Sequence, residues 1–178
     1  MDAPVLETPR LLLRPPRVEE LPDWIAMMAD PDVARFIGGV QPPSMVWRGL
    51  MAMIGAWHAT GVSMFSVIER DSGRWLGRIG PWCPHGWPGT EVGWSLVRSA
   101  WGRGFALEAA GAAMDYAFDV LQWDEVIHTI DPANVASQRV AERLGSVRRG
   151  PSHLPPPHHE AEVELWAQSR ADWQRRRA

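Results

Sequence analysis

The chain has 178 residues, of which 46% are hydrophobic and 22% are charged, and its formal net charge is −3. This length predicts a single domain over residues 1–178, and the weak negative charge argues against a nucleic-acid-binding surface, which normally needs a basic excess. No run approaches the ~20 apolar residues that a membrane-spanning helix needs, and the N-terminus has no apolar signal core. We therefore expect a cytoplasmic protein with no membrane partner, and the lone Cys83, which cannot form an intrachain disulfide, agrees with a reducing compartment.

The first half of the chain alternates apolar runs with turn residues. Val5 to Arg14 is predicted to be one strand, which Pro15 and Pro16 end because proline cannot donate a backbone hydrogen bond. Ser44 is a candidate N-cap for a helix that Gly61 ends. The other elements expected in this half are a helix over 18–28 and strands over 64–69 and 75–80, joined by a turn over 70–73.

The second half alternates strands with helices. Asn134 is predicted to cap a helix that ends before Gly145. The prolines of residues 150–159 argue against a regular element there, and Arg175 to Arg177 is predicted to be a solvated tail. The other elements expected are a loop over 81–88, a strand over 91–97, a helix to about 121, a strand over 124–130 and a last strand over 163–168.

The junction at residues 101–106, Trp-Gly-Arg-Gly-Phe-Ala, is the most informative segment, because an apolar strand runs through it directly into a helix. Gly102 and Gly104 let the backbone approach a ligand closely, and the first turn of the helix adds unpaired amides and the positive end of its dipole. These features favour a phosphate-binding site. A Walker A loop is excluded because no Gly-Lys-Ser/Thr is present, and a dinucleotide fingerprint would need Gly or Ala where Leu107 stands.

The same junction resembles the acyl-CoA pyrophosphate loop of the GNAT superfamily of N-acyltransferases, whose usual pattern is Gln/Arg-x-x-Gly-x-Gly/Ala. Trp101 stands at the first position, as is common in the branch that contains the ribosomal-protein N-terminal alanine and serine acetyltransferases. Three further segments resemble landmarks of that branch and occur in its order: Leu6 to Pro15, Asp30 to Gly39, and Asn134 to Gly145. The resemblance covers roughly residues 5 to 173.

The resemblance implies an α/β fold in which a central, mixed and mostly antiparallel sheet is flanked by helices. Its fourth and fifth strands, here 91–97 and 124–130, would run parallel and splay apart, and the opening would admit the pantetheine arm of acetyl-CoA. The implied function is that of an acetyl-CoA-dependent N-acetyltransferase, which moves an acetyl group directly to a primary amine on a protein N-terminus or a small molecule. Neither a metal nor a nucleic acid is expected as a partner, and a homodimer stays open.

The resemblance also implies a set of contacts with acetyl-CoA. Backbone groups of Leu96 and Val97 would pair with pantetheine amides, and the amides of residues 102–106 would hold the pyrophosphate. Arg98 and Arg103 would add charge beside the phosphates, although both also fit as exposed loop arginines. The residues expected at the cofactor, including the helix cap Asn134, are Leu96, Val97, Arg98, Trp101, Gly102, Arg103, Gly104, Phe105, Ala106 and Asn134.

Acyl transfer to an amine needs a neutral amine, a polarised carbonyl and a proton for the departing thiolate. Many GNAT members place a tyrosine acid seven residues after the asparagine, but Ala141 stands there. We therefore assign Ser137 as the acid or water-positioning group, with a plain helix serine as the alternative. Glu91 is assigned as the base, directly or through water, with a salt-bridged structural carboxylate as the alternative. His128 is expected to be structural.

Two other classes of function stay open. A silent acyl-CoA-binding module would need the phosphate turn but no acid, and another kind of nucleotide-binding α/β protein is disfavoured by the motifs that are missing. The amine acceptor is not identified by the sequence; we expect its site among loops 37–44, 81–88 and 150–159, with one or two of Trp82, Trp87 and Trp94 in its wall. The histidines near the last loop lack metal-ligand spacing, so no metal site is expected.

Overall fold

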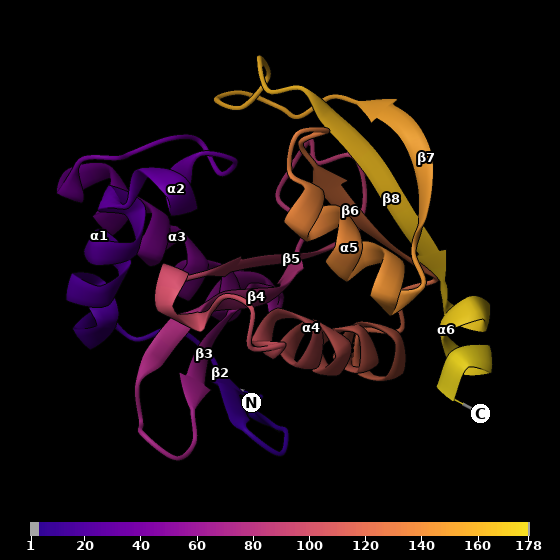
Figure 1. Cartoon of the computed structure of the whole chain (residues 1–178), viewed down its shortest axis with the longest axis horizontal. Coiled ribbons are helices and arrows are strands. Elements are labelled where there is room, and N and C mark those ends of the chain that lie inside the picture. Colours follow the sequence, from indigo (N-terminus) through magenta and orange to yellow (C-terminus); the bar gives the residue numbers. More distant parts are fainter. Residues whose placement is uncertain (1–3, 178) are drawn as a thin grey trace.

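The computed structural model describes residues 4–177, and within them one sheet of eight strands has the order β1-β2-β3-β4-β5-β6-β8-β7 (Figure 1). Neighbouring strands are antiparallel except β5 and β6, which are parallel. The mixed, mostly antiparallel sheet implied by the resemblance is therefore confirmed. The strands are β1 (Leu6–Glu7), β2 (Leu11–Arg14), β3 (Phe65–Glu69), β4 (Trp75–Trp82), β5 (Glu91–Leu96), β6 (Glu125–Ile130), β7 (Val147–Ser152) and β8 (Val163–Ser169).

The strands β5 and β6 part almost at once. Within the described chain their register holds a single pair, Glu91 with Ile127, whereas β4 follows β5 from Gly77 to Trp82. On its other side β6 pairs with β8 along its whole length. These are the expected fourth and fifth strands, and their divergence opens the sheet beside the second half of β5.

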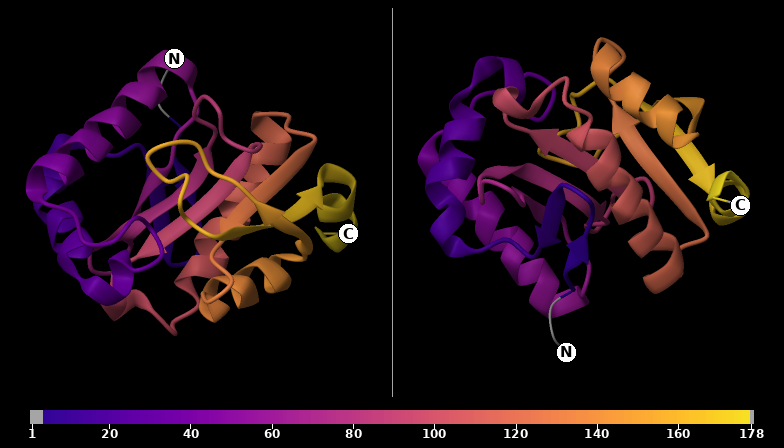
Figure 2. Two further views of the ribbon diagram at one scale, coloured as in Figure 1. Left: turned by 90° about the horizontal axis from the view of Figure 1, so that it is seen from above. Right: turned by 60° about the horizontal axis from the view of Figure 1, so that its bottom comes forward.

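Helices cover both faces of the sheet (Figure 2). The α4 helix packs over β2, β4 and β5, where Phe65 and Ala109 belong to the larger buried core. The α1 and α3 helices pack together on the opposite face, with Trp24 and Leu50 in a second core. Among residues 4–177, no helix is long and apolar enough to cross a membrane. The helices are α1 (Leu21–Ala29), α2 (Pro31–Ala34), α3 (Pro43–Thr60), α4 (Phe105–Asp115), which a π-helical turn (Tyr116–Val120) extends, α5 (Val135–Leu144) and α6 (Arg170–Arg177).

Local chemistry explains most of the helix ends that the sequence predicted. The side chain of Asn134 caps α5 by accepting the amide of Ser137 at 3.1 Å, and Gly145 ends this helix with a left-handed φ of 92°. Gly61 ends α3 in the same way, with φ of 71°. The predicted cap Ser44 is wrong, because α3 already begins at Pro43, where proline's missing amide has no helical partner to lose.

Three expectations about the chain ends and the sheet edge are corrected. Residues 5–14 form two strands, because the Thr8 hydroxyl closes a turn between them by accepting the amide of Leu11 at 3.0 Å. The strand β7 covers the first residues of the proline-rich segment, because an edge strand tolerates Pro151. The last residues form α6 instead of a solvated tail, because Trp173 is buried and its indole N–H donates to Asp115 at 2.8 Å.

The close approach of β4 to β5 at Gly77 gives a stability prediction. Its φ is 143°, and a Cβ there would lie 2.2 Å from the carbonyl oxygen of Ser95. Gly77→Ala should therefore lower the free energy of unfolding by about 2 kcal/mol or more, measured by urea denaturation. Gly111→Ala is the control, because an added Cβ in this part of α4 meets no atom within 4 Å, and it should be neutral or stabilising. Equal stabilities of the two variants would contradict the tight strand contact.

Candidate active site

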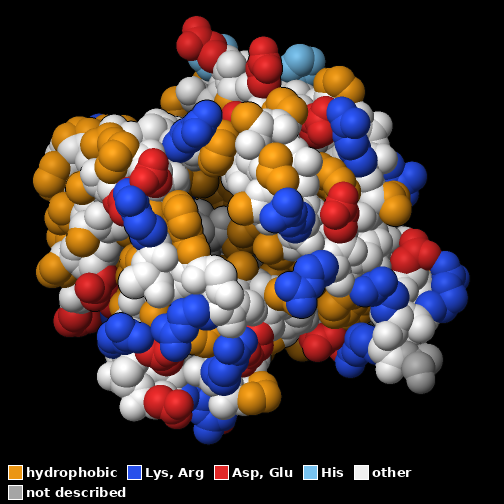
Figure 3. Space-filling view, in the orientation of Figure 1, with side chains coloured by type: hydrophobic (Ala, Val, Ile, Leu, Met, Phe, Trp, Pro, Cys, Tyr) orange, Lys and Arg blue, Asp and Glu red, His pale blue; other side chains and the backbone are white. Residues whose placement is uncertain are grey.

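The divergence of β5 and β6 opens onto a cavity of about 520 Å³. Its wall is built by the second half of β5, the turn before α4, the first turn of α4, one side of α5, and α2 with Phe36 and Ile37 after it. The space-filling view shows a hollow in the middle of this face, with hydrophobic side chains around it (Figure 3). Segments far apart in the sequence therefore meet at one concave and largely apolar site, as ligand sites usually do.

The predicted phosphate turn forms one edge of this cavity. Gly102 and Gly104 have left-handed φ values of 71° and 78°, and Gly104 lies directly before α4. The amides that follow it lie in the first turn of α4, where backbone donors have no partner inside the helix. The buried Phe105 ring anchors the turn, because the guanidinium groups of Arg10 and Arg103 each lie 4.5 Å from its centroid.

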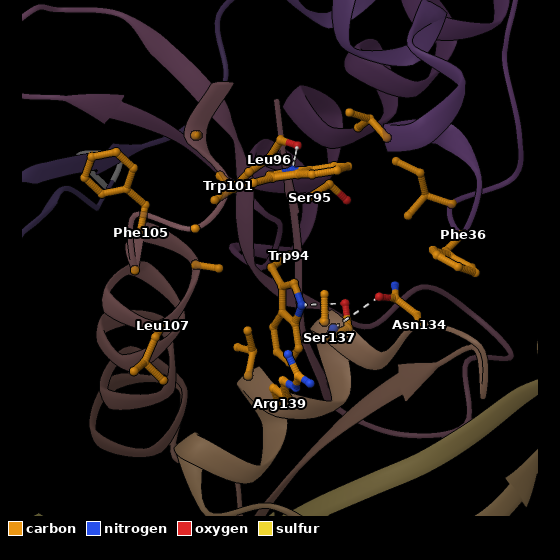
Figure 4. Close-up of a pocket in the computed structure, with 18 of the residues that line it drawn as sticks. Phe36, Trp94, Ser95, Leu96, Trp101, Phe105, Leu107, Asn134, Ser137 and Arg139 are labelled. Atoms are coloured by element: carbon orange, nitrogen blue, oxygen red, sulfur yellow. Dashed lines mark hydrogen bonds between the residues drawn. The ribbon is translucent and has the colours of Figure 1, made fainter. Parts of the chain in front are cut away.

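Most of the residues expected at the cofactor line the cavity: Leu96, Trp101, Gly102, Gly104, Phe105, Ala106 and Asn134 (Figure 4). Val97 does not line it, and its amide donates to the carbonyl oxygen of Leu76 at 2.9 Å. The carbonyl oxygen of Leu96 accepts the indole N–H of Trp101, also at 2.9 Å. The carbonyl oxygen of Leu96 can accept a second hydrogen bond, from a ligand, through its other lone pair. The Val97 amide could donate to a ligand only by giving up its hydrogen bond to Leu76.

The two arginines expected beside the phosphates are held in ion pairs instead of lining the cavity. Arg98 lies 2.5 Å from both Asp30 and Asp32 at the start of α2, and its hydrogen bond lowers the pKa of Asp30. Arg103 pairs with Glu69 at 2.8 Å. Both arginines therefore tie the loops around the cavity to the rest of the structure.

Sequence reasoning missed three other arginines that do line the cavity, Arg35 beside α2 and two on α5. Arg139 and Arg143 lie on α5, and no ion pair among residues 4–177 involves either side chain. The available signal was their spacing of four residues, which places both on one face of the helix that Asn134 caps. Positive charge without a partner at a cavity wall is suited to phosphate.

Ser137 lies on the cavity wall in the first turn of α5 (Figure 4). Its amide is held by Asn134, and its hydroxyl oxygen accepts the indole N–H of Trp94 at 3.1 Å. Trp94 belongs to β5, so this hydrogen bond crosses the opening between the diverging halves of the sheet. The hydroxyl that the sequence singled out is therefore inside the cavity.

Glu91 is buried, 6% exposed, and does not line the cavity. It accepts hydrogen bonds from the amide and the hydroxyl of Thr129, each 3.1 Å from Oε1, and from the indole N–H of Trp87. Burial raises its pKa to about 7, although these hydrogen bonds favour the charged form. No ion pair among the described residues involves Glu91. Glu91 precedes the cavity residue Trp94 by three residues, which is about 10 Å along β5. A proton that passes from the cavity to Glu91 would therefore need water to carry it.

His128 lies among buried partners. It is 1% exposed, with Nδ1 2.7 Å from the carbonyl oxygen of Val92 and Nε2 2.9 Å from the hydroxyl of Ser146. Burial lowers its pKa to about 4, so the ring is neutral near pH 7. A neutral ring has one donor, which the Val92 carbonyl requires, so the Ser146 hydroxyl must donate to Nε2.

The three tryptophans expected in an acceptor wall separate into two places. Trp94 lines the cavity, whereas Trp82 and Trp87 do not. These two contact each other edge to face, with their ring centroids 6.5 Å apart. The His-containing loop after β7 adds no metal site that the structure describes, since no three His, Cys, Asp or Glu side chains of residues 4–177 gather as metal ligands would.

Comparison with known proteins agrees with this geometry. Residues 10–147 match a family model described as an acetyltransferase (GNAT) domain. Among curated relatives, YkkB of Bacillus subtilis is 33% identical over 118 residues, which are 65% of this chain and 69% of that protein. Other relatives are named as N-acetyltransferases.

Solved structures share the fold over almost the whole chain. An acetyltransferase from Agrobacterium tumefaciens is 29% identical and has a TM-score of 0.82, covering 94% of this chain and 95% of that one. The ribosomal alpha-N-protein acetyltransferase RimL, in complex with coenzyme A, is 14% identical and has a TM-score of 0.76, covering 93% of this chain and 98% of that one. With its family model, its relatives and its fold in agreement, the chain belongs to the GNAT family of N-acetyltransferases.

Proposed function

We propose that the protein moves an acetyl group from acetyl-CoA to a primary amine while both substrates are bound. The observation that carries the proposal is the cavity in which the glycine turn before α4 and the opening between β5 and β6 meet. The turn suits a phosphate, and the opening suits a narrow, extended thioester arm.

Binding of the donor is supported by the groups around the turn. The first amides and the positive dipole end of α4 attract a pyrophosphate. Arg139 and Arg143 add two charges that no carboxylate of the described residues neutralises. The coenzyme A bound to RimL, on the same fold, supports acetyl-CoA as the donor.

The acceptor is proposed to enter beside Phe36 and Ile37. These residues and Trp94 give the cavity apolar walls. Such walls favour a neutral amine, because burial disfavours an ammonium group. RimL is a ribosomal alpha-N-protein acetyltransferase, which supports a protein N-terminus as the acceptor; a small-molecule amine is the second candidate.

In the proposed reaction, the amine nitrogen attacks the carbonyl carbon of the thioester and the carbon–sulfur bond breaks, giving the acetylated amine and the CoA thiol. The amine proton passes through water to Glu91, whose pKa of about 7 suits a base near neutral pH. The Ser137 hydroxyl gives its proton to the departing sulfur, and the proton that left the amine returns through water to Ser137, so that the CoA thiol and the original hydroxyl are formed. Holding both substrates side by side supplies much of the rate.

The alternative function, a silent acyl-CoA-binding module, has no support in the comparisons, which match acetyltransferases. Such a module would need the phosphate turn alone. A serine hydroxyl on the cavity wall and a buried carboxyl group with a pKa of about 7 on the same strand as Trp94 favour the transferase.

The phosphate turn provides the test of this function. Gly104→Val should raise the Kd for acetyl-CoA at least about tenfold by calorimetry, because a β-branched side chain is strained at a φ of 78° and stands where the pyrophosphate is expected. The same variant should lose CoA release from acetyl-CoA in a screen of amines and N-terminal peptides, in which the wild type is active.

Gly73→Val is the matched control. Its φ is 69° and it lies in the turn between β3 and β4, so it carries similar backbone strain away from the cavity. It should bind acetyl-CoA like the wild type. A wild type that releases no CoA with any amine, or a Gly104→Val variant that binds as tightly as Gly73→Val, would contradict the proposed function.

The buried carboxyl group gives a pH prediction. A base must be deprotonated, so kcat/KM should fall as the pH drops below the Glu91 pKa of about 7, and Glu91→Gln should remove this acidic limb. Trp87→Phe removes a hydrogen bond that favours the charged form, so it should raise the midpoint of the limb while keeping it. An acidic limb that is the same in all three proteins would assign the limb to the amine substrate.

A further inference from the structure

We infer that Trp94 is a positioning residue, whose indole N–H orients the Ser137 hydroxyl as a hydrogen-bond donor into the cavity. The inference rests on the proposed acetyl transfer, in which this hydroxyl faces the departing sulfur. Trp94 itself would touch neither the reacting carbon nor the sulfur through its N–H, and it acts through Ser137.

The direction of the hydrogen bond follows from the chemistry of the two groups. An indole N–H can only donate, so the Ser137 oxygen is the acceptor of the 3.1 Å contact with Trp94. The backbone amide of Ser137 is already used by the cap Asn134. Among the described residues, no acceptor takes the hydroxyl hydrogen of Ser137, and this residue lines the cavity. The hydrogen is therefore available to a ligand.

The orientation of the Ser137 hydroxyl matters because a serine hydroxyl on a helix can also donate to the backbone of its own helix. Its hydrogen rotates freely and often bonds to the carbonyl oxygen one turn earlier, here that of Ala133. With the indole N–H on one lone pair, the hydrogen points away from Trp94. A hydroxyl that accepts one hydrogen bond is also a better donor, because chained hydrogen bonds polarise one another.

Trp94 can orient its partner because it is itself held firmly. Its ring lies 4.8 Å from that of His128, at an angle of 53°. His128 is in turn fixed between the Val92 carbonyl and the Ser146 hydroxyl. Trp94 also packs against a small buried cluster formed by Ile130, Ala141 and Trp166. Many GNAT members have the tyrosine acid at the position of Ala141, and here Trp94 packs against the cluster that contains this alanine.

The test is Trp94→Phe, which keeps an aromatic ring and removes the donor. We expect kcat for acetyl transfer to fall about three- to tenfold, the range that one hydrogen bond corresponds to, while KM for acetyl-CoA stays within about twofold. Trp166→Phe is the matched control, because Trp166 belongs to the same cluster and its buried indole N–H has no hydrogen-bond partner among residues 4–177. It should keep the wild-type kcat.

A double-mutant cycle separates positioning from packing. In a Ser137→Ala background, Trp94→Phe should cause no further loss of kcat, because the group that it orients is gone. Thermal unfolding checks that each variant is folded, and Trp94→Leu, also without a donor, replaces Trp94→Phe where the latter does not fold.

Three results would overturn the inference while leaving acetyl transfer intact: a wild-type kcat in Trp94→Phe, an unchanged kcat in Ser137→Ala, or an equal loss from Trp94→Phe with and without Ser137. A wild type that transfers acetyl to no amine would instead overturn the proposed function itself, and the inference with it.

Discussion

The parting of β5 from β6 after a single register pair is the constraint on which the rest of the site depends. In a continuous sheet, a neighbouring strand would cover the backbone from Trp94 to Leu96 on that side. Because the two strands are parallel, the helices that follow them, α4 and α5, both begin at the same end of the opening. Their first turns therefore bring unpaired amides, a glycine turn and a capping asparagine to one place, which is where open α/β sheets usually bind ligands.

Most of the residues that line the cavity are uncharged. Arg98 and Arg103 are committed to carboxylates in loops, and His128 is neutral near pH 7. The cavity is lined mostly by apolar side chains, together with the indoles of Trp94 and Trp101 and the serines Ser95 and Ser137; its charged residues are Asp32, Arg35, Arg139 and Arg143. Such a lining suits a reaction in which two substrates are held side by side and the protein directs hydrogen bonds, because neutral donors need no costly desolvation of charge.

The sequence predicted the parts whose cause is local. The glycine turn before α4, the Asn134 cap and the glycines after α3 and α5 each follow from a residue's own backbone preference. The parts that it missed depend on contacts distant in the chain. The α6 helix is held in place by the hydrogen bond from Trp173 to Asp115. Pro151 is tolerated in β7 because β7 is an edge strand of the described sheet. In the same way, the ion pairs of Arg98 and Arg103 and the burial of Glu91 depend on residues tens of positions away.

A crystal structure of the protein with CoA tests the central claim most directly, namely that the opening between β5 and β6 receives the thioester arm. The account predicts pyrophosphate oxygens about 3 Å from the amides at the start of α4, and the thiol sulfur in the opening within hydrogen-bond reach of Ser137. A CoA whose arm lies along the outer surface, with no part of it in the opening, would contradict it.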